Sequence, residues 1–342
     1  MLVIRPIRED DYASLYKIAC ESGIGFTSLP VNEELLRSKI TRAVRSFSRR
    51  AHKPGPESYL MVMEDTSTGE VVGTCGIEAC VGLTDAFYHY HVGKVVHSSR
   101  ELKVHNTVET LTLCNDYTGS AELCTLFLRE SHRRGLAGRL LSRSRMLLMA
   151  EHPELFGSPV IAEMRGVSDE HGRSPFWQWL EQHFFSMDFP TADYLTGIGQ
   201  KVFIAELMPK YPIYVNLLSE AAQDVIGKVH EKTQPALQLL KTEGFRCKGY
   251  VDIFDAGPTV EAELSQIRSV RNSQRRHLLI VDEVEVAEAE DFMIANTQLA
   301  NYRCALAKAK LDDETGAVLL TAEAADVLCV KQGDPLRVLA VK

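Results

Sequence analysis

The sequence contains eight cysteines but no CxxC pair, and no apolar run approaches the roughly 20 residues that a membrane-spanning helix needs. Because structural zinc sites need clustered ligands, we expect reduced and mostly buried thiols. The GxxxxGK phosphate loop, the GxSxG nucleophile elbow and the HExxH zinc helix are also absent. His89 and His91 form the one close histidine pair, and their alternation suits one face of a strand. We expect no metal site.

Basic residues are in the minority, with 38 lysines and arginines against 46 acidic residues and a net charge of −8. This balance argues against broad binding to nucleic acid or to an anionic membrane, although a local basic patch can hold a small anion. The opening MLVIRPIREDD becomes charged at its fifth residue, unlike a signal peptide. We predict a cytoplasmic protein that binds neither nucleic acid nor membrane.

What the sequence does contain is the composition of a folded globular protein, with 45% hydrophobic and 25% charged residues. Its 342 residues suffice for two domains. Strand and helix patterns mix up to about residue 257, and after it the composition changes, with four arginines in 268–277 and an acid-rich stretch at 282–291. We predict an α/β (α+β) domain over 1–257 and a small β-rich domain over 258–342.

Periodicity places the main elements along the first of these domains. Apolar residues at three- and four-residue steps predict helices over 33–47, 175–185 and 234–242. Apolar β-prone runs predict strands over 122–128, 159–164 and 201–208.

A basic turn follows the strand predicted over 122–128 and opens a helix that we expect to end near residue 150. Gly135, Ala137 and Gly138 carry little or no side chain, so backbone N–H groups can approach an anion at the positive end of this helix. Further cations for phosphates come from Arg133, Arg134, Arg139 and Arg143. We expect the last two, four residues apart, to share a face away from the leucines. The turn suits a pyrophosphate, and the alternative is a turn that binds no ligand.

The order strand, HRRGLAG and helix resembles the acyl-CoA-binding motif of the GNAT acetyltransferase superfamily, Gln/Arg-x-x-Gly-x-Gly/Ala. Gly135 and Ala137 fit this pattern, whereas His132 stands at its first position. The opening IRPIREDDYASLYKIA (4–19) looks like the first strand and helix of that superfamily. The resemblance implies a GNAT-like mixed sheet flanked by helices.

The chain resembles the arginine N-succinyltransferase family more closely, through runs spread from the N-terminus to about residue 260. These runs are TSLPVNEE (27–34), NDYTGSAELCTLFL (115–128), IAEMRGVSDEHGRSPFWQWL (161–180), FFSMDF (184–189), FIAELMPKYPIYV (203–215), IGKVHEKTQPA (226–236) and GYVDIFDAGPT (249–259). The last eighty residues resemble the family less clearly.

The resemblance implies transfer of a succinyl group from succinyl-CoA, a co-substrate rather than a bound cofactor, to the α-amino group of L-arginine. This is the first step of a pathway of arginine catabolism. The family's proton donor falls on His230, and its succinyl-CoA contact falls on Leu126. Such chemistry needs a base for the ammonium, donors for the oxyanion and an acid for the departing thiolate.

Charged residues in EMRGVSDEHG (163–172), at the end of the strand predicted over 159–164 and before the next helix, are the candidates for binding the substrates. Glu163, Asp169 and Glu170 can pair with the arginine guanidinium. The alternative is helix capping by residues 169–174. Arg165 can meet the succinyl carboxylate, or it can pair with Glu163 or Asp169.

Three other functions remain open from the sequence. The chain can acylate another amine such as ornithine, can be the non-catalytic member of a pair of related subunits, or can be a sensor that binds without turnover. A homo-oligomer is equally compatible with the sequence. We favour direct attack in a ternary complex over a covalent route through Cys124, whose thiol we expect to be buried packing.

Overall fold

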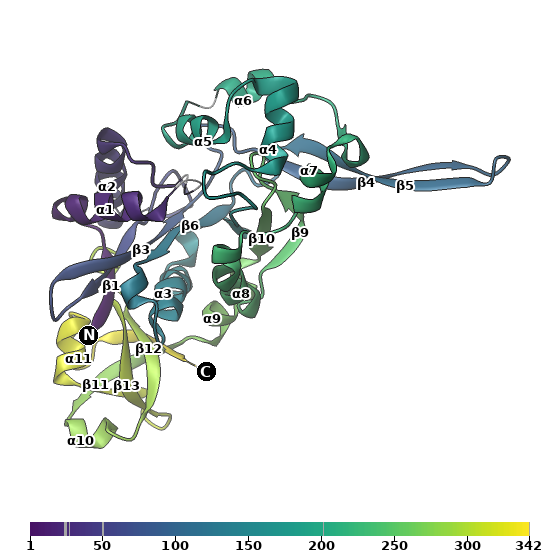
Figure 1. The fold of residues 1–342 in the computed structure, drawn as a ribbon. Coiled ribbons are helices and arrows are strands. Elements are labelled where there is room, and N and C mark those ends of the chain that lie inside the picture. The colour runs from purple at the N-terminus through teal and green to yellow at the C-terminus, as the bar shows by residue number, and fades with distance from the viewer. Residues whose placement is uncertain (24–25, 27, 50, 201, 342) are drawn as a thin grey trace.

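A mixed β-sheet runs through the molecule, which a computed structural model describes for residues 1–23, 26, 28–49, 51–200 and 202–341 (Figure 1). Its first ten strands lie in the order β1 (Leu2–Pro6), β2 (Met61–Asp65), β3 (Glu70–Glu78), β6 (Ala121–Leu128), β7 (Val160–Glu163), β10 (Pro258–Ala262), β9 (Arg246–Val251), β4 (His89–Ser99), β5 (Val104–Cys114) and β8 (Ile213–Tyr214). Among these ten strands, β6 and β7 pair in parallel, and all the other neighbouring pairs are antiparallel. The predicted mixed sheet flanked by helices is confirmed.

Helices flank the sheet (Figure 1). They are α1 (Tyr12–Ser22), α2 (Glu33–Ser48), α3 (Ala137–Glu151), α4 (Pro175–Leu180), α5 (Phe189–Gly197), α6 (Val202–Leu207), α7 (Glu220–Val225), α8 (Gln234–Thr242), α9 (Arg268–Asn272), α10 (Glu283–Val286) and α11 (Ala322–Val327). Among the described residues, no helix has the length and apolar character needed to cross a membrane.

The prediction of a strand over 201–208 is wrong for the described part of that range, because residues 202–207 form α6. Ile204 and Met208, four residues apart, are the buried positions of this segment. Their spacing matches one face of a helix, and alanine, glutamate, leucine and methionine at 205–208 favour helix over strand.

The C-terminal strands close on themselves. They are β11 (Gln274–Val281), β12 (Glu290–Asn296), β13 (Cys304–Asp312), β14 (Ala317–Thr321) and β15 (Pro335–Ala340), and the pairings β12–β15–β11–β14–β13–β12 form a ring. β13 also pairs with β1, which joins the ring to the first sheet. A boundary at residue 257 would separate β10 from its partners β7 and β9. We therefore propose to draw the domain boundary after β10.

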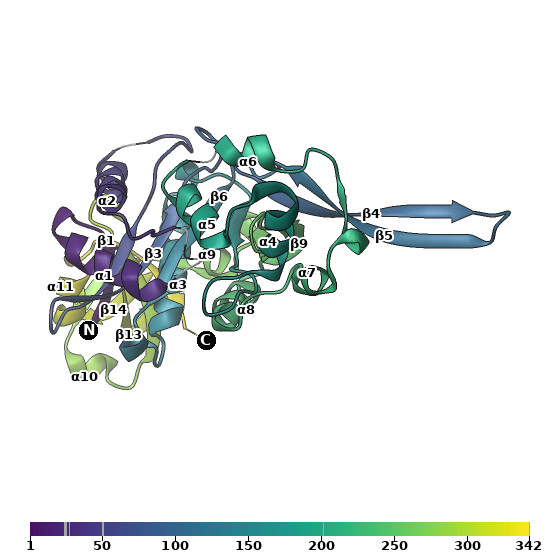
Figure 2. The same ribbon diagram turned by 45° about the horizontal axis from the view of Figure 1, so that its top comes forward.

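A two-stranded arm extends from the body (Figure 2). β4 and β5 pair along their full 11 residues, and the arm pairs with β9 at Tyr90 and His91 and with β8 at Thr110 and Leu111. His89 lies at the base of the arm, where β4 joins the sheet, and it is fully buried.

Candidate active site

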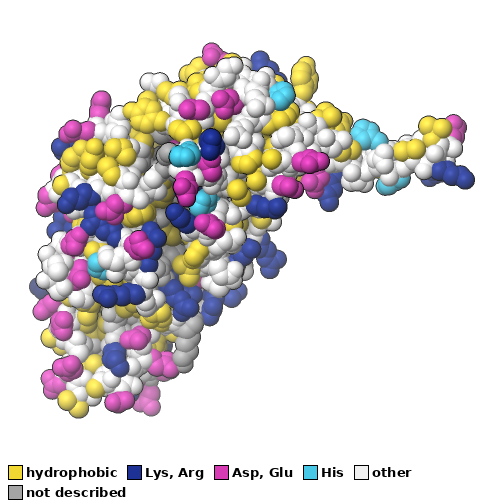
Figure 3. Space-filling view, viewed as in Figure 1, with side chains coloured by type: hydrophobic (Ala, Val, Ile, Leu, Met, Phe, Trp, Pro, Cys, Tyr) yellow, Lys and Arg dark blue, Asp and Glu magenta, His cyan; other side chains and the backbone are white. Residues whose placement is uncertain are grey.

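A cleft opens where β6 and β7 separate. The two strands pair at Ala121–Val160 and Glu122–Ile161, and β6 then continues to Leu128 without β7 beside it. Residues of both strands, of α5 and of α8 line the open space, whose volume is about 2040 Å³. Figure 3 shows histidine, acidic and basic side chains side by side on the face between α5 and β6. The separation of the strands thus exposes backbone and charged groups together.

A β-bulge bends β6 where it forms the wall of this cleft. Cys124 pairs with Gly76 and Phe127 with Thr74, so Thr125 and Leu126 together oppose one residue of β3. Thr125 has a φ of 55°, a conformation that costs a β-branched residue about 1–3 kcal/mol. Leu126, the predicted contact of succinyl-CoA, also lines the cleft.

The basic turn before α3 lines the same cleft. Gly135 has a φ of 55°, which glycine adopts at little cost, and a side chain at Gly135 or Gly138 would meet no heavy atom within 4 Å. These glycines lie in the cleft lining together with Arg133, Arg134 and Arg139. Ala137 is not brought to the cleft, because its methyl group is buried in the core and its N–H donates to the carbonyl of Arg134.

Arg143, which we expected to supply a cation for phosphates beside Arg139, lines the same cleft but is already paired. Arg143 is buried, and its Nε donates to Glu243 Oε1 over 2.7 Å. The second carboxylate oxygen of Glu243 accepts from the backbone of Ser269. The segments around α8 and α9 cover this face of α3, so the Arg143 charge is already neutralised.

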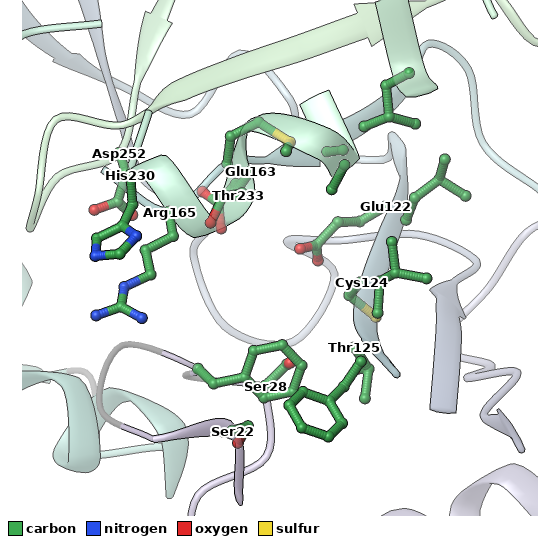
Figure 4. A pocket seen from close by; sticks show the side chains of 18 of the residues that line it. Ser22, Ser28, Glu122, Cys124, Thr125, Glu163, Arg165, His230, Thr233 and Asp252 are labelled. Carbon is green, nitrogen blue, oxygen red and sulfur yellow. The ribbon is translucent and has the colours of Figure 1, made fainter. Parts of the chain in front are cut away.

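His230 stands at the turn before α8, on the opposite side of the cleft from β6 (Figure 4). Its Nδ1 accepts a hydrogen bond from the backbone N–H of Lys232, over 3.1 Å, which places the proton of the neutral ring on Nε2. Burial and the neighbouring Arg165 guanidinium lower the pKa of His230. At neutral pH the ring is therefore uncharged and presents an Nε2–H donor.

The segment that carries Arg165 is fixed from two sides. Asp255 accepts hydrogen bonds from the N–H groups of Gly166 and Gly257, at 2.6 and 2.8 Å. A Cβ atom at Gly166 would lie 2.5 Å from the Asp255 carbonyl oxygen, so only glycine fits there. The backbone N–H of His230 donates to the carbonyl of Arg165 over 2.9 Å. Arg165 and His230 are thus held as neighbours.

Arg165 is a half-buried cation on the cleft wall. Its Nη2 donates to Ser168 Oγ over 3.0 Å, while its buried Nε makes no hydrogen bond within the part of the chain that the structure describes. Burial lowers the pKa of Arg165, and Asp255 and Asp193 oppose this effect. A buried guanidinium donor without a partner costs free energy that an anionic ligand can recover.

The three predicted acidic residues line the cleft but differ in their surroundings. Asp169 is exposed and accepts from the backbone of His171 and Arg173, and it pairs with the Arg173 side chain at 2.7 Å. This organises the loop before α4, whose N-cap is Ser174 rather than Asp169. Glu170 is exposed, whereas the Glu163 side chain is 27% exposed and lies at the end of β7.

The buried group behind Glu163 was not predicted from the sequence. His89 Nε2 lies 2.9 Å from Glu163 Oε1, and the His89 side chain is 0% exposed. Burial lowers the pKa of His89 to about 4, against the opposing effects of Asp252, Glu122 and Asp116. The alternation of His89 and His91 indicates a strand, but nothing in the sequence around these residues indicates that a carboxylate of β7 lies beside His89.

Among the described residues, no group of three or more metal-ligating side chains is found.

Titration of His89 predicts a loss of stability in acid. The folded pKa of about 4 lies below the ordinary value of 6.5, so the unfolded chain binds more protons between these pH values. The contribution of neutral His89 to the stability of the folded state is present above about pH 6.5 and is lost as the pH falls toward 4. We expect unfolding to become easier by about 2 kcal/mol between pH 7 and pH 5, measured by urea denaturation. The free energy of unfolding of the His89→Phe variant should fall less over the same pH range. A fall as large as that of the unaltered chain would show that titration of His89 is not the cause.

Two family models match nearly the whole chain. A family model described as arginine N-succinyltransferase beta subunit matches residues 2–269, and a second model, for the C-terminal domain of the same beta subunit, matches residues 275–340. The chain belongs to the arginine N-succinyltransferase family. The family prediction made from the sequence runs is confirmed, and the matches extend to the C-terminal part, where the sequence resemblance is less clear.

Members of the arginine N-succinyltransferase family are similar to this chain over nearly its full length. Arginine N-succinyltransferases of Salmonella paratyphi B (strain ATCC BAA-1250 / SPB7) and Salmonella newport (strain SL254) are each 49% identical to it, covering 99% of this chain and 97% of theirs. The solved structure of arginine/ornithine succinyltransferase subunit AI from Pseudomonas aeruginosa superposes with a TM-score of 0.91 at 36% identity. That superposition covers 100% of this chain and 99% of the other.

Proposed function

We propose that the chain transfers the succinyl group of succinyl-CoA to the α-amino group of L-arginine in the cleft between β6 and β7. The observation that carries this proposal is that one continuous cleft is lined both by the basic turn at 133–139 and by the charged groups around His230 and Arg165. A CoA thioester needs both, because its phosphates and its reacting carbonyl lie at different ends of a long molecule.

The basic turn supplies the anion site for CoA. Backbone N–H groups near Gly135 and Gly138 lie at the positive end of α3, a helix of 15 residues. Arg133, Arg134 and Arg139 add positive charge at the surface of the same site. Leu126, on the bulged wall, lies against the acyl arm. We assign these residues to succinyl-CoA.

The bulge directs backbone groups of β6 toward the reacting carbonyl. Beyond Glu122, no strand among the described residues pairs with β6 on its β7 side, so the backbone groups of β6 there can bond to a ligand. An N–H donor held in a rigid strand stabilises the negative oxygen that forms when an amine attacks a thioester. The strained Thr125 conformation fixes this geometry before the substrate binds.

The reaction forms a C–N bond and breaks the C–S bond. The arginine ammonium carries three protons and the product amide one, so two protons leave the nitrogen. One ends on the CoA thiol and the other is released. We assign protonation of the departing thiolate to His230, which lines the same cleft as Arg165 (Figure 4). The ring takes up a proton from solvent during turnover, donates it from Nε2 as the imidazolium and returns to the neutral form.

Charge complementarity assigns the remaining groups. The half-buried Arg165 guanidinium is the partner of the succinyl carboxylate, while Asp169, Glu170 and Glu163 offer carboxylates for the cations of arginine. Asp169 already pairs with Arg173, so Glu170 is the more available of the two exposed acids.

A covalent route through Cys124 has little support. Burial raises the pKa of the Cys124 thiol, and the nearby Glu122 carboxylate raises it further. A protonated thiol is a poor nucleophile at neutral pH. Direct attack in a ternary complex remains our proposal.

Thiol release from succinyl-CoA by the purified chain alone tests the proposed function. We expect release that depends on L-arginine, with a kcat/KM for arginine about tenfold or more above that for L-ornithine, because a guanidinium forms bidentate pairs that an ammonium cannot. A preference for ornithine would overturn the acceptor. No release from folded protein would overturn the chain as a self-sufficient enzyme and would support a homologous second subunit as the active partner.

A further inference from the structure

We propose that His89 is a positioning residue for Glu163, and that the Glu163 carboxylate binds the α-ammonium of arginine and takes its first proton. This inference rests on the proposed function and deepens it, because the base for that reaction is otherwise unassigned. It is carried by the contact between a fully buried histidine and a carboxylate on the wall of the cleft.

The burial of His89 calls for an explanation beyond packing. Its ring lies edge-on to Phe87 and Tyr117, each with centroids 4.9 Å away, a setting in which a phenyl ring would pack equally well. Neither ring nitrogen has a well-aligned hydrogen-bond partner among the described residues. Two buried polar atoms left in this way cost free energy, which a phenylalanine would avoid. The polar contact that the ring does make is with Glu163.

The charge states of the two groups determine which of them donates the proton in this contact. Burial keeps His89 neutral, and a neutral imidazole 2.9 Å from a carboxylate oxygen is attracted only if it points an N–H at that oxygen. His89 therefore carries its proton on Nε2 and directs it at Glu163 Oε1. The contact is not yet a straight hydrogen bond, and contacts of this kind commonly tighten when the substrate binds.

Glu163 is placed where the amine has to arrive. It is the last residue of β7, its backbone is held in register with Thr259 of β10, and its side chain lines the cleft. Across the gap, β6 contributes Glu122 and the bulge to the same cleft. An ammonium at Glu163 thus lies beside the strand along which we place the thioester.

The surrounding charges favour a cation at this point. Glu122 from β6, Asp252 from the segment after β9 and Asp116 from the segment after β5 all act on His89 electrostatically, and all are acidic. The ammonium therefore enters an anionic site. Its N–H bond then breaks, the proton forms an O–H bond with Glu163, and the electron pair left on nitrogen attacks the thioester carbonyl. Glu163 returns the proton to solvent through the open cleft.

This assignment separates the two proton transfers. Glu163 removes a proton from the nucleophile on the β7 side, while His230 protonates the thiolate from the turn before α8. The guanidinium is then left to the exposed acids at the rim of the cleft. Of these, Glu170 takes no part in the ion pair between Asp169 and Arg173.

Three single variants and one double variant test the pair. His89→Phe keeps the ring and removes the nitrogens, His89→Gln keeps an N–H near the position of Nε2, and Glu163→Gln removes the base. We expect His89→Phe to lower kcat/KM for arginine about 10- to 100-fold, leaving KM for succinyl-CoA unchanged, and His89→Gln to recover most of this loss. Tyr90→Phe, a change at a buried residue on the same strand whose hydroxyl contacts Met208, is the matched control with no expected effect.

The double variant distinguishes positioning from a structural role. If His89 acts through Glu163, then His89→Phe with Glu163→Gln should be no worse than Glu163→Gln alone, and the acid limb of the pH profile should disappear in both. The inference would be overturned if the losses of kcat/KM in the two single variants multiplied in the double variant. It would also be overturned if Tyr90→Phe lost as much activity as His89→Phe.

Calorimetric titration with L-arginine in the presence of CoA separates this inference from the proposed function. Weaker arginine binding in Glu163→Gln and His89→Phe supports the pair even if the chain alone releases no thiol. Unchanged binding and an unchanged pH profile in these variants would overturn the pair while leaving the transferase activity in place.

Discussion

Replacing His230 by asparagine should lower kcat by about 10²- to 10⁴-fold without unfolding the turn before α8. His230 has two separable tasks in the structure. Its Nδ1 caps the short turn by accepting from Lys232 N–H, and its Nε2 is the atom that we assign to proton transfer. Asparagine is a good capping residue but has no titratable nitrogen, so it preserves the first task and removes the second.

The comparison with His230→Ala makes this test specific. Alanine removes both tasks and is expected to lower the thermal unfolding midpoint as well as kcat, whereas asparagine should lower kcat alone. Thiol release and thermal unfolding of the two variants check this. Full activity in the asparagine variant would show that His230 only caps the turn.

Local patterns were enough to find the basic turn and the helix that follows it. The apolar run at 122–128, the small residues at 135–138 and the leucines of α3 all lie within one short stretch of sequence. The structure has β6 and α3 close to the predicted bounds. The pairing of Arg143 could not be predicted, because its partner, Glu243, is separated from it by 100 residues. Helical periodicity shows which residues share a face, but not which distant element covers it.

The contact between His89 and Glu163 was beyond such reasoning for a related cause. It depends on the strand order β7, β10, β9, β4, in which strands from distant parts of the chain become neighbours. The bulge at Thr125 could not be predicted either, because it is defined by the register in which β6 pairs with β3. The sequence offered Glu163 and Arg165 as candidates by their charge, and His230 through the family resemblance. The long-range strand pairings then place His89 beside Glu163, and they place Asp255 against the backbone next to Arg165.

The Arg165→Met variant should lower kcat/KM for succinyl-CoA about 10- to 100-fold, the loss expected when a charge-assisted hydrogen bond to a carboxylate is removed. Burial lowers the pKa of the Arg165 guanidinium, but arginine is so strong a base that the group remains protonated. Its Ser168 contact and the Asp255-bound segment beneath it hold the group at the cleft wall. Methionine has a similar length and fills the same space without the charge.

Butyryl-CoA provides the matched substrate, because its acyl group has the same four carbons as succinyl but no terminal carboxylate. If Arg165 binds that carboxylate, the kcat/KM of the variant for butyryl-CoA should equal that of the unaltered chain, and Arg165→Lys should recover only part of the loss with succinyl-CoA. A loss that persists with butyryl-CoA but vanishes when L-argininamide replaces L-arginine would instead assign Arg165 to the carboxylate of the acceptor. Steady-state thiol release with these four substrates decides between the two carboxylates, since each pair differs by the one group that the guanidinium would contact.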